Sequence, residues 1–241
     1  MAGVPPVSRE TTAPAEPEAE VRHALEQRYP SAASGLRAYA SLLTSTGVER
    51  GLLGPREQPR LWSRHLANSA VIEELVPTDA VVVDVGSGAG LPGLPLALVR
   101  ADLRLVLVEP LLRRSTFLAE VVAELGLEGR VDVRRARAED LTEPLGTVVT
   151  ARAVAPLVRL AGWVLPLVAV GGELLALKGS QAQDELRAAQ PALTRLGAGP
   201  PRIAHCGAGV VDPPTTVVRV PRQRVVPAAR SAAPGQGRRR R

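Results

Sequence analysis

Cysteine, lysine and aromatic side chains are scarce in this 241-residue chain, and each scarcity excludes a class of protein. The single cysteine, Cys206, excludes a disulfide framework and a cysteine-rich zinc site. No other metal-binding motif occurs, so we expect no bound metal. The chain has two Trp, two Tyr and one Phe, too few for a platform on which several single-stranded bases stack.

Long apolar runs are missing as well. The N-terminus has no run of signal-peptide length, and the most apolar stretch, residues 157–170, is interrupted by Arg159 and is too short to span a bilayer. We therefore expect a soluble cytoplasmic protein that binds no membrane. The length and the 45% hydrophobic content fit one α/β domain with a sizeable core, and we expect a monomer.

The formal net charge of +6 is concentrated near the C-terminus. Residues 222–241 contain seven arginines and no acidic residue, which is typical of an interaction arm or of a solvated, disordered end. Residues 1–17 are rich in Pro, Ala, Thr and Glu without a hydrophobic period, so we expect disorder there too. Lys178 is the only lysine, so arginine replaces lysine throughout and its abundance alone does not indicate affinity for RNA.

A helical pattern precedes the first strand. Apolar residues at helical spacing predict helices over 18–29 and 34–47, and a further helical segment over 60–75 after a turn-rich connection. We interpret residues 18–79 as an N-terminal helical cap.

From residue 80 onward, strands alternate with helices, a pattern that predicts a mostly parallel sheet with right-handed crossovers. Between the strands we expect helices, of which the one over 181–196 should kink or end at Pro191. This α/β domain spans residues 80–221 and leaves 222–241 as a basic tail. The expected strands number about seven and lie at residues 80–85, 104–109, 131–135, 147–151, 173–178, 202–206 and 215–220.

A glycine-rich loop follows the first strand and predicts a ligand site. A β-branched strand is followed by Gly86, Gly88 and Gly90 and then by a helix, whose N-terminal N–H groups point into the crevice at the carboxyl end of the sheet. The Gly-x-Gly-x-Gly spacing is tighter than that of the dinucleotide fingerprint. Asp84 would repel a pyrophosphate but could attract an ammonium or sulfonium group. The loop therefore favours a ligand without a pyrophosphate.

Three later positions extend this site. Glu109 ends the second strand, where an acidic residue commonly accepts hydrogen bonds from ribose hydroxyls, although it could be an ordinary strand-end charge. Residues 137–140 follow the third strand and should border an adenine, or Glu139 or Asp140 could cap a helix. Arg152 follows the fourth strand at the mouth of the crevice. A nucleoside that carries a sulfonium, S-adenosylmethionine, satisfies these features.

Six motifs in order along the chain resemble the RsmG (GidB) family of bacterial 16S rRNA guanine-N7 methyltransferases. The resemblance covers about residues 35–220 and implies a class I S-adenosylmethionine-dependent methyltransferase fold, Rossmann-like, acting on a guanine in the decoding-region loop of 16S rRNA. The motifs are Gly54-Pro55-Arg56-Glu57 with Leu61-Trp62-x-Arg64-His65, Asp84 to Gly93, Arg113-Arg114-x-x-Phe117-Leu118, Arg137-Ala138-Glu139, Thr150-Ala151-Arg152-Ala153 and Leu177-Lys178-Gly179.

The resemblance also implies individual cofactor contacts. Together with the residues read from the loop and strand ends, the predicted cofactor-binding set is Gly86, Gly88, Gly90, Leu91, Glu109, Ala138, Glu139 and Arg152. The chain departs from the common family pattern at Leu91, where many members have Phe, in lacking a clear Asn-Leu-Thr in the early helices, and in its longer basic C-terminus.

The chemistry of guanine N7 agrees with what the sequence lacks. N7 presents an in-plane lone pair, so no general base is needed, and alignment and desolvation can accelerate the transfer. Cys206 lies on a late strand, far from the expected site, and so does not suit carbon-5 methylation. Asp212-Pro213-Pro214 lacks the aromatic residue of amine-methylating motifs and is interpreted as a turn. Arg152 and Lys178 remain the candidates for a catalytic contact.

Recognition of RNA should depend on phosphate contacts and on RNA shape. Because the chain between its two ends is only mildly basic, we expect the substrate to be structured 16S rRNA or a small-subunit particle. A methyltransferase of the same fold acting on a small molecule or protein, and a non-catalytic ribosome-binding protein, remain alternatives. The candidate RNA contacts, each of which could instead be structural or an ordinary surface charge, are Arg56, Arg64, His65, Arg113, Arg114 and Lys178.

Overall fold

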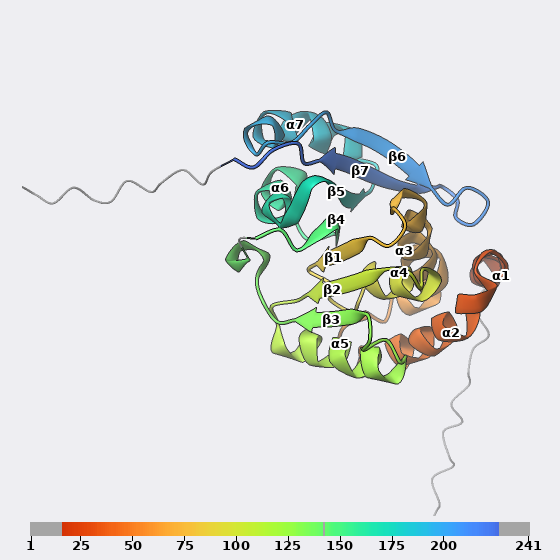
Figure 1. Ribbon diagram of the computed structural model, residues 1–241. Helices are drawn as coiled ribbons and strands as arrows, with labels where there is room; N and C mark the ends of the chain where they lie inside the picture. The colour runs from red at the N-terminus through yellow and green to blue at the C-terminus, as the bar shows by residue number, and fades with distance from the viewer. Residues whose placement is uncertain (1–15, 142, 227–241) are drawn as a thin grey trace, which may run out of the picture.

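Seven strands form one sheet in the order β3-β2-β1-β4-β5-β7-β6 (Figure 1). The computed structural model describes residues 16–141 and 143–226. The strands β1 to β5 run parallel, and β7 lies antiparallel to both β5 and β6, which confirms the predicted mostly parallel sheet. Their bounds are β1 Val81–Val85, β2 Arg104–Val108, β3 Val131–Arg134, β4 Gly146–Arg152, β5 Val168–Lys178, β6 Arg202–Cys206 and β7 Thr215–Pro221.

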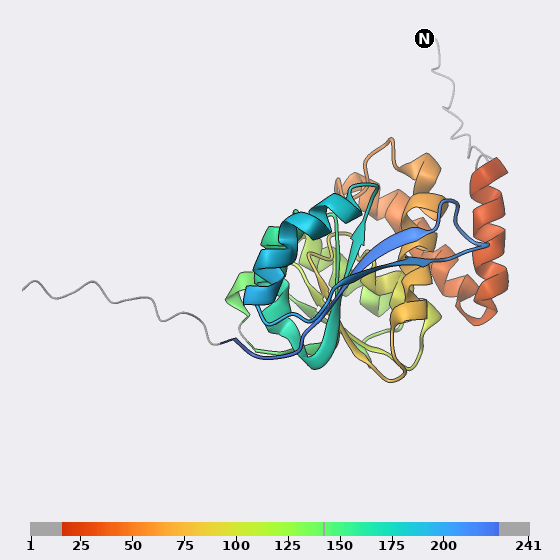
Figure 2. The same cartoon turned by 90° about the horizontal axis from the view of Figure 1, so that it is seen from above.

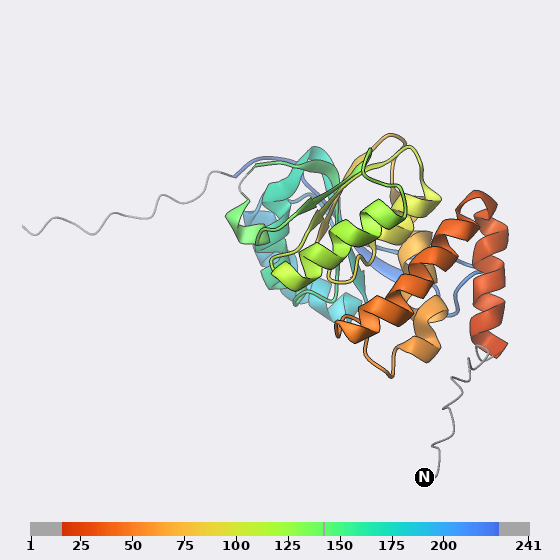
Figure 3. The same ribbon diagram turned by 90° about the horizontal axis from the view of Figure 1, so that it is seen from below.

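The alternation of side chains along each strand builds two cores, one on each face of the sheet. Val82 and Leu105 belong to a core shared with the cap helices, α4 and α5, whereas Val83 and Val106 belong to a core shared with α6 and α7. Figure 2 and Figure 3 show these two helical layers on opposite faces. The bounds of the helices are α4 Gly93–Val99, α5 Leu112–Glu124, α6 Leu157–Val164 and α7 Ala182–Arg195, with 3₁₀ turns η6 Ala138–Asp140 and η7 Leu165–Leu167.

Helix α7 does not end at Pro191 but continues to Arg195. The rest of the predicted strand pattern in this domain agrees with the structure to within a few residues, except that β5 begins earlier, at Val168.

The predicted cap is helical but more broken than its periodicity indicates. It contains α1 Glu16–Arg28, η1 Pro30–Ala32, α2 Ala33–Leu42, η2 Leu43–Gly47, η3 Gln58–Arg60, η4 Leu61–Ala67, α3 Asn68–Ala70 and η5 Val71–Leu75. The elements η2 and η4 are π-helical. Directly after η4, the side chain of Asn68 donates to the carbonyl of Ser63, 2.6 Å away, which suits a turn wider than that of an α-helix.

A buried carboxylate fixes where η4 begins. Glu18, on α1, is only 6% exposed and accepts hydrogen bonds from the N–H groups of Trp62 at 2.8 Å and Ser63 at 3.3 Å. It also contacts the Ser63 hydroxyl. These N–H groups belong to the first turn of η4 and have no partner within the helix, so the carboxylate satisfies them and joins α1 to the rest of the cap.

The ends of the folded region differ from the prediction. Helix α1 begins at Glu16, two residues before the expected cap, and Arg222, predicted to start the tail, belongs to the fold. Its side chain is 7% exposed and donates to the carbonyl of Pro166 at 2.7 Å, and its backbone pairs with Gly171 and Gly172. Residues 223–226 of the predicted tail are also described, and the N–H of Gln223 donates to the carbonyl of Gly197 at 3.0 Å. The remainder of the two predicted disordered ends, 1–15 and 227–241, lies outside the described residues. No helix in the described part of the chain is long and apolar enough to cross a membrane.

Replacing Glu18 should destabilise the protein. We expect Glu18→Ala to lower the free energy of unfolding by about 1–2 kcal/mol, because the first N–H groups of η4 lose their acceptor. The exposed Glu20 on the same helix provides the control, since Glu20→Ala removes the same charge from α1 without touching η4. Urea unfolding of both variants measures the difference, and equal stabilities would contradict this role for Glu18.

Candidate functional site

The glycine loop between β1 and α4 adopts a backbone that only glycine takes readily. Gly86, Gly88 and Gly90 have φ angles of 69°, 59° and 104°. A Cβ atom on Gly90 would also lie 2.3 Å from the side chain of Leu94. The spacing of these glycines is thus set by the path of the loop, and the predicted order of strand, loop and helix is confirmed.

Asp84 holds this loop from inside and does not face a ligand. Its carboxylate is fully buried and accepts hydrogen bonds from the N–H of Gly93 at 3.1 Å and the hydroxyl of Thr150 at 3.2 Å. The expectation that Asp84 attracts a cationic group of the ligand is therefore wrong, because its carboxylate points into the protein. On β1 the side chain of Asp84 alternates with those of Val83 and Val85, so it points to the face that α4 covers.

The cap reaches the glycine loop through Tyr39. This residue of α2 is fully buried, and its hydroxyl donates to the carbonyl of Ala89 at 2.7 Å. Tyr39 fixes the central part of the loop from the cap side, while Asp84 fixes its end. The sequence shows Tyr39 only as an apolar position on a helix face, so this contact was not predicted.

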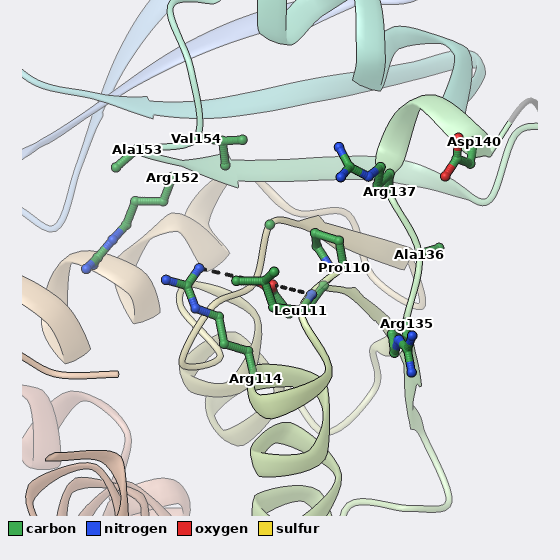
Figure 4. Close-up of a pocket in the computed structure, with 12 residues that line it drawn as sticks. Pro110, Leu111, Arg114, Arg135, Ala136, Arg137, Asp140, Arg152, Ala153 and Val154 are labelled. Atoms are coloured by element: carbon green, nitrogen blue, oxygen red, sulfur yellow. Dashed lines mark hydrogen bonds and ion pairs between the residues drawn. The ribbon is translucent and has the colours of Figure 1, made fainter. Parts of the chain in front are cut away.

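Glu109 lies at the carboxyl end of β2, as predicted, and is nearly fully buried. Its two carboxylate oxygens accept hydrogen bonds from the N–H groups of Gly88 and Leu111, each at 3.0 Å. Arg114 lies 3.9 Å from the carboxylate (Figure 4). Each oxygen keeps a further lone pair, so the carboxylate can still accept ribose hydroxyls.

A pocket of about 710 Å³ opens at the carboxyl ends of β1, β2 and β4. Its lining contains three of the predicted cofactor-binding residues, Gly86, Glu109 and Arg152. Gly88 and Gly90 shape the loop behind it. The pocket is lined by Gly86, Glu109, Pro110, Leu111, Arg114, Arg135, Ala136, Arg137, Asp140, Arg152, Ala153 and Val154 (Figure 4).

The other three predicted cofactor residues do not line this pocket. Leu91 packs against the core beneath the cap, and Ala138 is buried in the core beneath α6. Glu139 points to an exposed position, where its carboxylate lies 3.9 Å from Arg137. The residues of this loop that face the pocket are Arg137 and Asp140, because the turn η6 directs Ala138 inward and Glu139 away.

These residues fit S-adenosylmethionine. The volume lies in the usual range for a ligand of this size. At Gly86 a Cβ atom would lie 2.8 Å from the side chain of Val154, so glycine keeps this wall of the pocket open. The buried acceptor Glu109, the exposed apolar side chain of Leu111 and the polar loop after β3 offer contacts for a ribose and a base.

Arg152 extends from the end of β4 to the cap, not into the pocket. Figure 4 shows its guanidinium directed away from Arg135 and Arg137. It donates to the Ser69 hydroxyl at 3.2 Å, to the carbonyls of Arg64 and His65 at 3.4 Å, and to the ring nitrogen Nδ1 of His65. The predicted position at the crevice mouth is right, but the charged group itself binds the cap.

His65 connects Arg152 to Glu57. A guanidinium has no acceptor, so Nδ1 of His65 must accept and Nε2 must carry the proton, which it donates to the Glu57 carboxylate at 2.7 Å. Burial, and then the nearby Arg152, lower the pKa of His65. The hydrogen bond from His65 lowers the pKa of Glu57. The imidazole is therefore neutral, and both ring nitrogens are occupied.

The loop after β4 is held in an unusual conformation. Ala153 has a φ of 54°, in the left-handed region that is rare for alanine. Lys178 donates to the carbonyl of Ala155 at 2.9 Å and pairs with Glu185 at 2.8 Å, while Glu185 accepts from the N–H of Leu157. The ammonium of Lys178 is thus engaged in fixing this loop, which gives the chain's only lysine a positioning role that the sequence did not show.

A second, larger cleft of about 1,490 Å³ adjoins the first, and both include Arg152 and Ala153. It lies between the cap, the loop after β4, the end of β5 and the segment 211–216. Among the predicted RNA contacts, Arg64, His65 and Lys178 line this cleft and Arg114 lines the first pocket. Arg56 and Arg113 are exposed and line neither. Asp212, Pro213 and Pro214 also line this cleft.

The residues that the structure describes contain no group of three or more His, Cys, Asp or Glu side chains placed to hold a metal ion. Cys206 is buried, and burial raises the pKa of its thiol to about 11, so it is not a reactive nucleophile.

The sheet order, the glycine loop and the buried acid at the end of β2 define a class I S-adenosylmethionine-dependent methyltransferase. Solved structures share the fold: an O-methyltransferase of Thermotoga maritima (TM-score 0.50, 12% identity, 65% of each chain) and the tRNA (m1A58) methyltransferase TrmI of Aquifex aeolicus (TM-score 0.50, 12% identity, 66% of this chain and 69% of that one).

Sequence relatives identify the family more closely. The family model described as GidB, rRNA small subunit methyltransferase G, matches residues 32–212. The ribosomal RNA small subunit methyltransferase G of Salinispora tropica is 57% identical over 200 residues, which cover 80% of this chain and 83% of the relative. The protein of that name from Streptomyces coelicolor is 61% identical over 184 residues, 76% of this chain and 77% of the relative. The chain belongs to the GidB family, and the predicted resemblance is confirmed.

The burial of Asp84 predicts a pH dependence of stability. Burial raises the pKa of Asp84 from 3.8 to about 6. The folded protein then binds this proton more tightly than the unfolded chain, so stability falls as the pH rises from about 4 to about 6. Relative to Asp84→Asn, the wild type should lose of order 3 kcal/mol over this interval. Denaturant unfolding at several pH values tests this, and parallel pH curves for the two proteins would contradict it.

Proposed function

We propose that this protein transfers the methyl group of S-adenosylmethionine to N7 of a guanine in the decoding-region loop of 16S rRNA. The observation that carries the proposal is the pocket built from the glycine loop and Glu109 in a chain of the GidB family. The relatives named above are small-subunit rRNA methyltransferases. Each is 57–61% identical to this chain, which supports a common substrate.

The groups around the β4 loop support the choice of N7. Methylation of an exocyclic amine or a hydroxyl requires removal of a proton, whereas N7 attacks with a lone pair that is already free. His65, the imidazole beside Arg152, has one nitrogen bonded to Arg152 and the other to Glu57, so it has no free nitrogen to act as a base. Orientation of two bound reactants is then the main task of the site.

When bound, S-adenosylmethionine supplies the electrophilic methyl group. In this proposal Glu109 accepts its ribose hydroxyls, and residues 135–137 and Asp140 border the base. The loop of Arg152, Ala153 and Val154 forms the wall nearest Gly86 and separates the pocket from the adjoining cleft. Because Tyr39, Asp84 and Lys178 fix the surrounding loops before any ligand arrives, little ordering remains to be done on binding.

Three further properties remain predictions. We propose that the protein acts as a monomer, in the cytoplasm, on structured 16S rRNA or a small-subunit particle. Direct displacement at N7 has no step that calls for a metal ion, so we expect protein that has been treated with a chelator and then separated from it to retain full activity.

Nucleoside analysis of 16S rRNA tests the proposed function directly. Deletion of the gene should remove one 7-methylguanosine from the decoding-region loop, and the wild-type gene should restore it. A Glu109→Ala variant should fail to restore it, because the carboxylate that accepts the ribose and orders Gly88 is lost. An unchanged 7-methylguanosine content in the deletion strain would overturn the proposal.

A further inference from the structure

The residues that line the first pocket indicate which way S-adenosylmethionine lies in it. Glu109, residues 135–137 and Asp140 lie on one side, where a ribose and base find their partners. The remaining part of the ligand, with the methyl-bearing sulfur, must then lie toward Gly86 and the wall formed by residues 152–154. That wall is where the second cleft begins, since Arg152 and Ala153 line both spaces. An acceptor that reaches the methyl group through the second cleft approaches it from the side opposite the adenosine.

On the side formed by the cap, here called the rim, the second cleft carries positive charge that suits a polyanion. Arg60 and Arg64 line it and are exposed, and Arg64 has a side chain that is 52% exposed and lies 3.5 Å from Glu57. Within residues 16–141 and 143–226, Arg60 has no carboxylate within 4.0 Å. Of the three acids in its lining, Glu57 binds His65 and Glu185 binds Lys178, while Asp212 lies on the segment 211–216, across the cleft from the cap. The rim thus presents two arginines that are available for phosphates.

The size of the cleft suits one nucleotide taken out of its stack. Enzymes that act on a base within structured nucleic acid turn the nucleotide into a pocket, and the flanking phosphates remain at the rim. The volume of about 1,490 Å³ exceeds that of a single small-ligand pocket, so it can take a nucleotide and part of its neighbours. Its lining includes small and polar side chains, such as those of Asn68, Ala155 and Thr215, and no Phe, Tyr or Trp.

We propose that the acceptor guanosine enters through this second cleft, between the cap and the segment 211–216, with its flanking phosphates on Arg60 and Arg64. The inference rests on the proposed function and adds the route and the contacts. According to this inference the acceptor approaches from the side of the cap. The alternative is an approach from the side of α5, where Arg113 is exposed. Arg60 was not among the residues that the sequence singled out.

Removal of the two rim arginines tests the route. Small subunits from cells that lack the gene serve as the probe, and their affinity is measured over a series of salt concentrations. We expect Arg60→Ala/Arg64→Ala to lower the affinity about tenfold at 0.1 M salt, and to reduce the slope of log affinity against log salt by about 0.7–0.9 per lost phosphate contact. Calorimetric affinity for S-adenosylmethionine should stay within twofold of the wild type, which shows that the variant is folded.

Two further variants give the comparison. Arg104→Ala/Arg202→Ala removes two exposed arginines at the amino ends of β2 and β6, on the edge of the sheet opposite the clefts, and should retain the wild-type salt slope. Arg113→Ala reports on the α5 face. If Arg113→Ala lowers the affinity and the rim pair does not, the acceptor enters on the α5 side and the inference is wrong. If the rim pair and the edge pair weaken binding equally, only net charge matters and the inference is equally wrong.

Failure of the proposed function would look different. The wild type would then bind S-adenosylmethionine but leave the small subunit unmethylated, and so would every arginine variant. Methylation by the wild type together with unaffected binding by the rim variant would overturn the route alone.

Discussion

The packing of the half-buried Arg152 guanidinium against the cap is the interaction on which the rest of the site depends. A charge taken out of water must be paired or fully hydrogen-bonded, and here the cap provides every acceptor: the hydroxyl of Ser69, the carbonyls of Arg64 and His65, and Nδ1 of His65. Since Arg152 ends β4, these bonds fix the loop that separates the two ligand spaces. The same bonds require a neutral imidazole, which donates to Glu57.

The cap is therefore part of the site. Tyr39 reaches from α2 to the carbonyl of Ala89 in the glycine loop, and Glu18 holds the start of η4, the segment that carries His65. On the other side of the sheet, Lys178 and Glu185 fix the continuation of the β4 loop from β5 and α7. Contacts from both layers thus converge on the carboxyl ends of β1 and β4, the region where a parallel sheet binds its ligands. A methyltransferase domain without the cap would leave Arg152 with no partner.

The sequence predicts the sheet, the glycine loop and the position of Glu109 because each depends on a local pattern: β-branched runs, glycine spacing, and an acid at a strand end. It does not predict where long or buried side chains point. The side chain of Asp84 points to the face of the sheet that α4 covers, and the sequence does not show which face that helix will cover. The side chain of Arg152 contacts the cap, which is more than eighty residues away in sequence. The same limit applies to the single lysine, whose ammonium holds a loop, and to Ala138 and Glu139, whose directions follow from one 3₁₀ turn.

The link between the cap and the β4 loop is tested most directly by a double-mutant cycle on His65 and Arg152. The rate of methyl transfer to small subunits, as kcat/KM, is measured for His65→Phe, Arg152→Met and the double variant. If the two residues act as one unit, the double variant is no slower than the slower single variant. Losses that multiply, so that the double variant shows the product of the two single effects, would contradict the account.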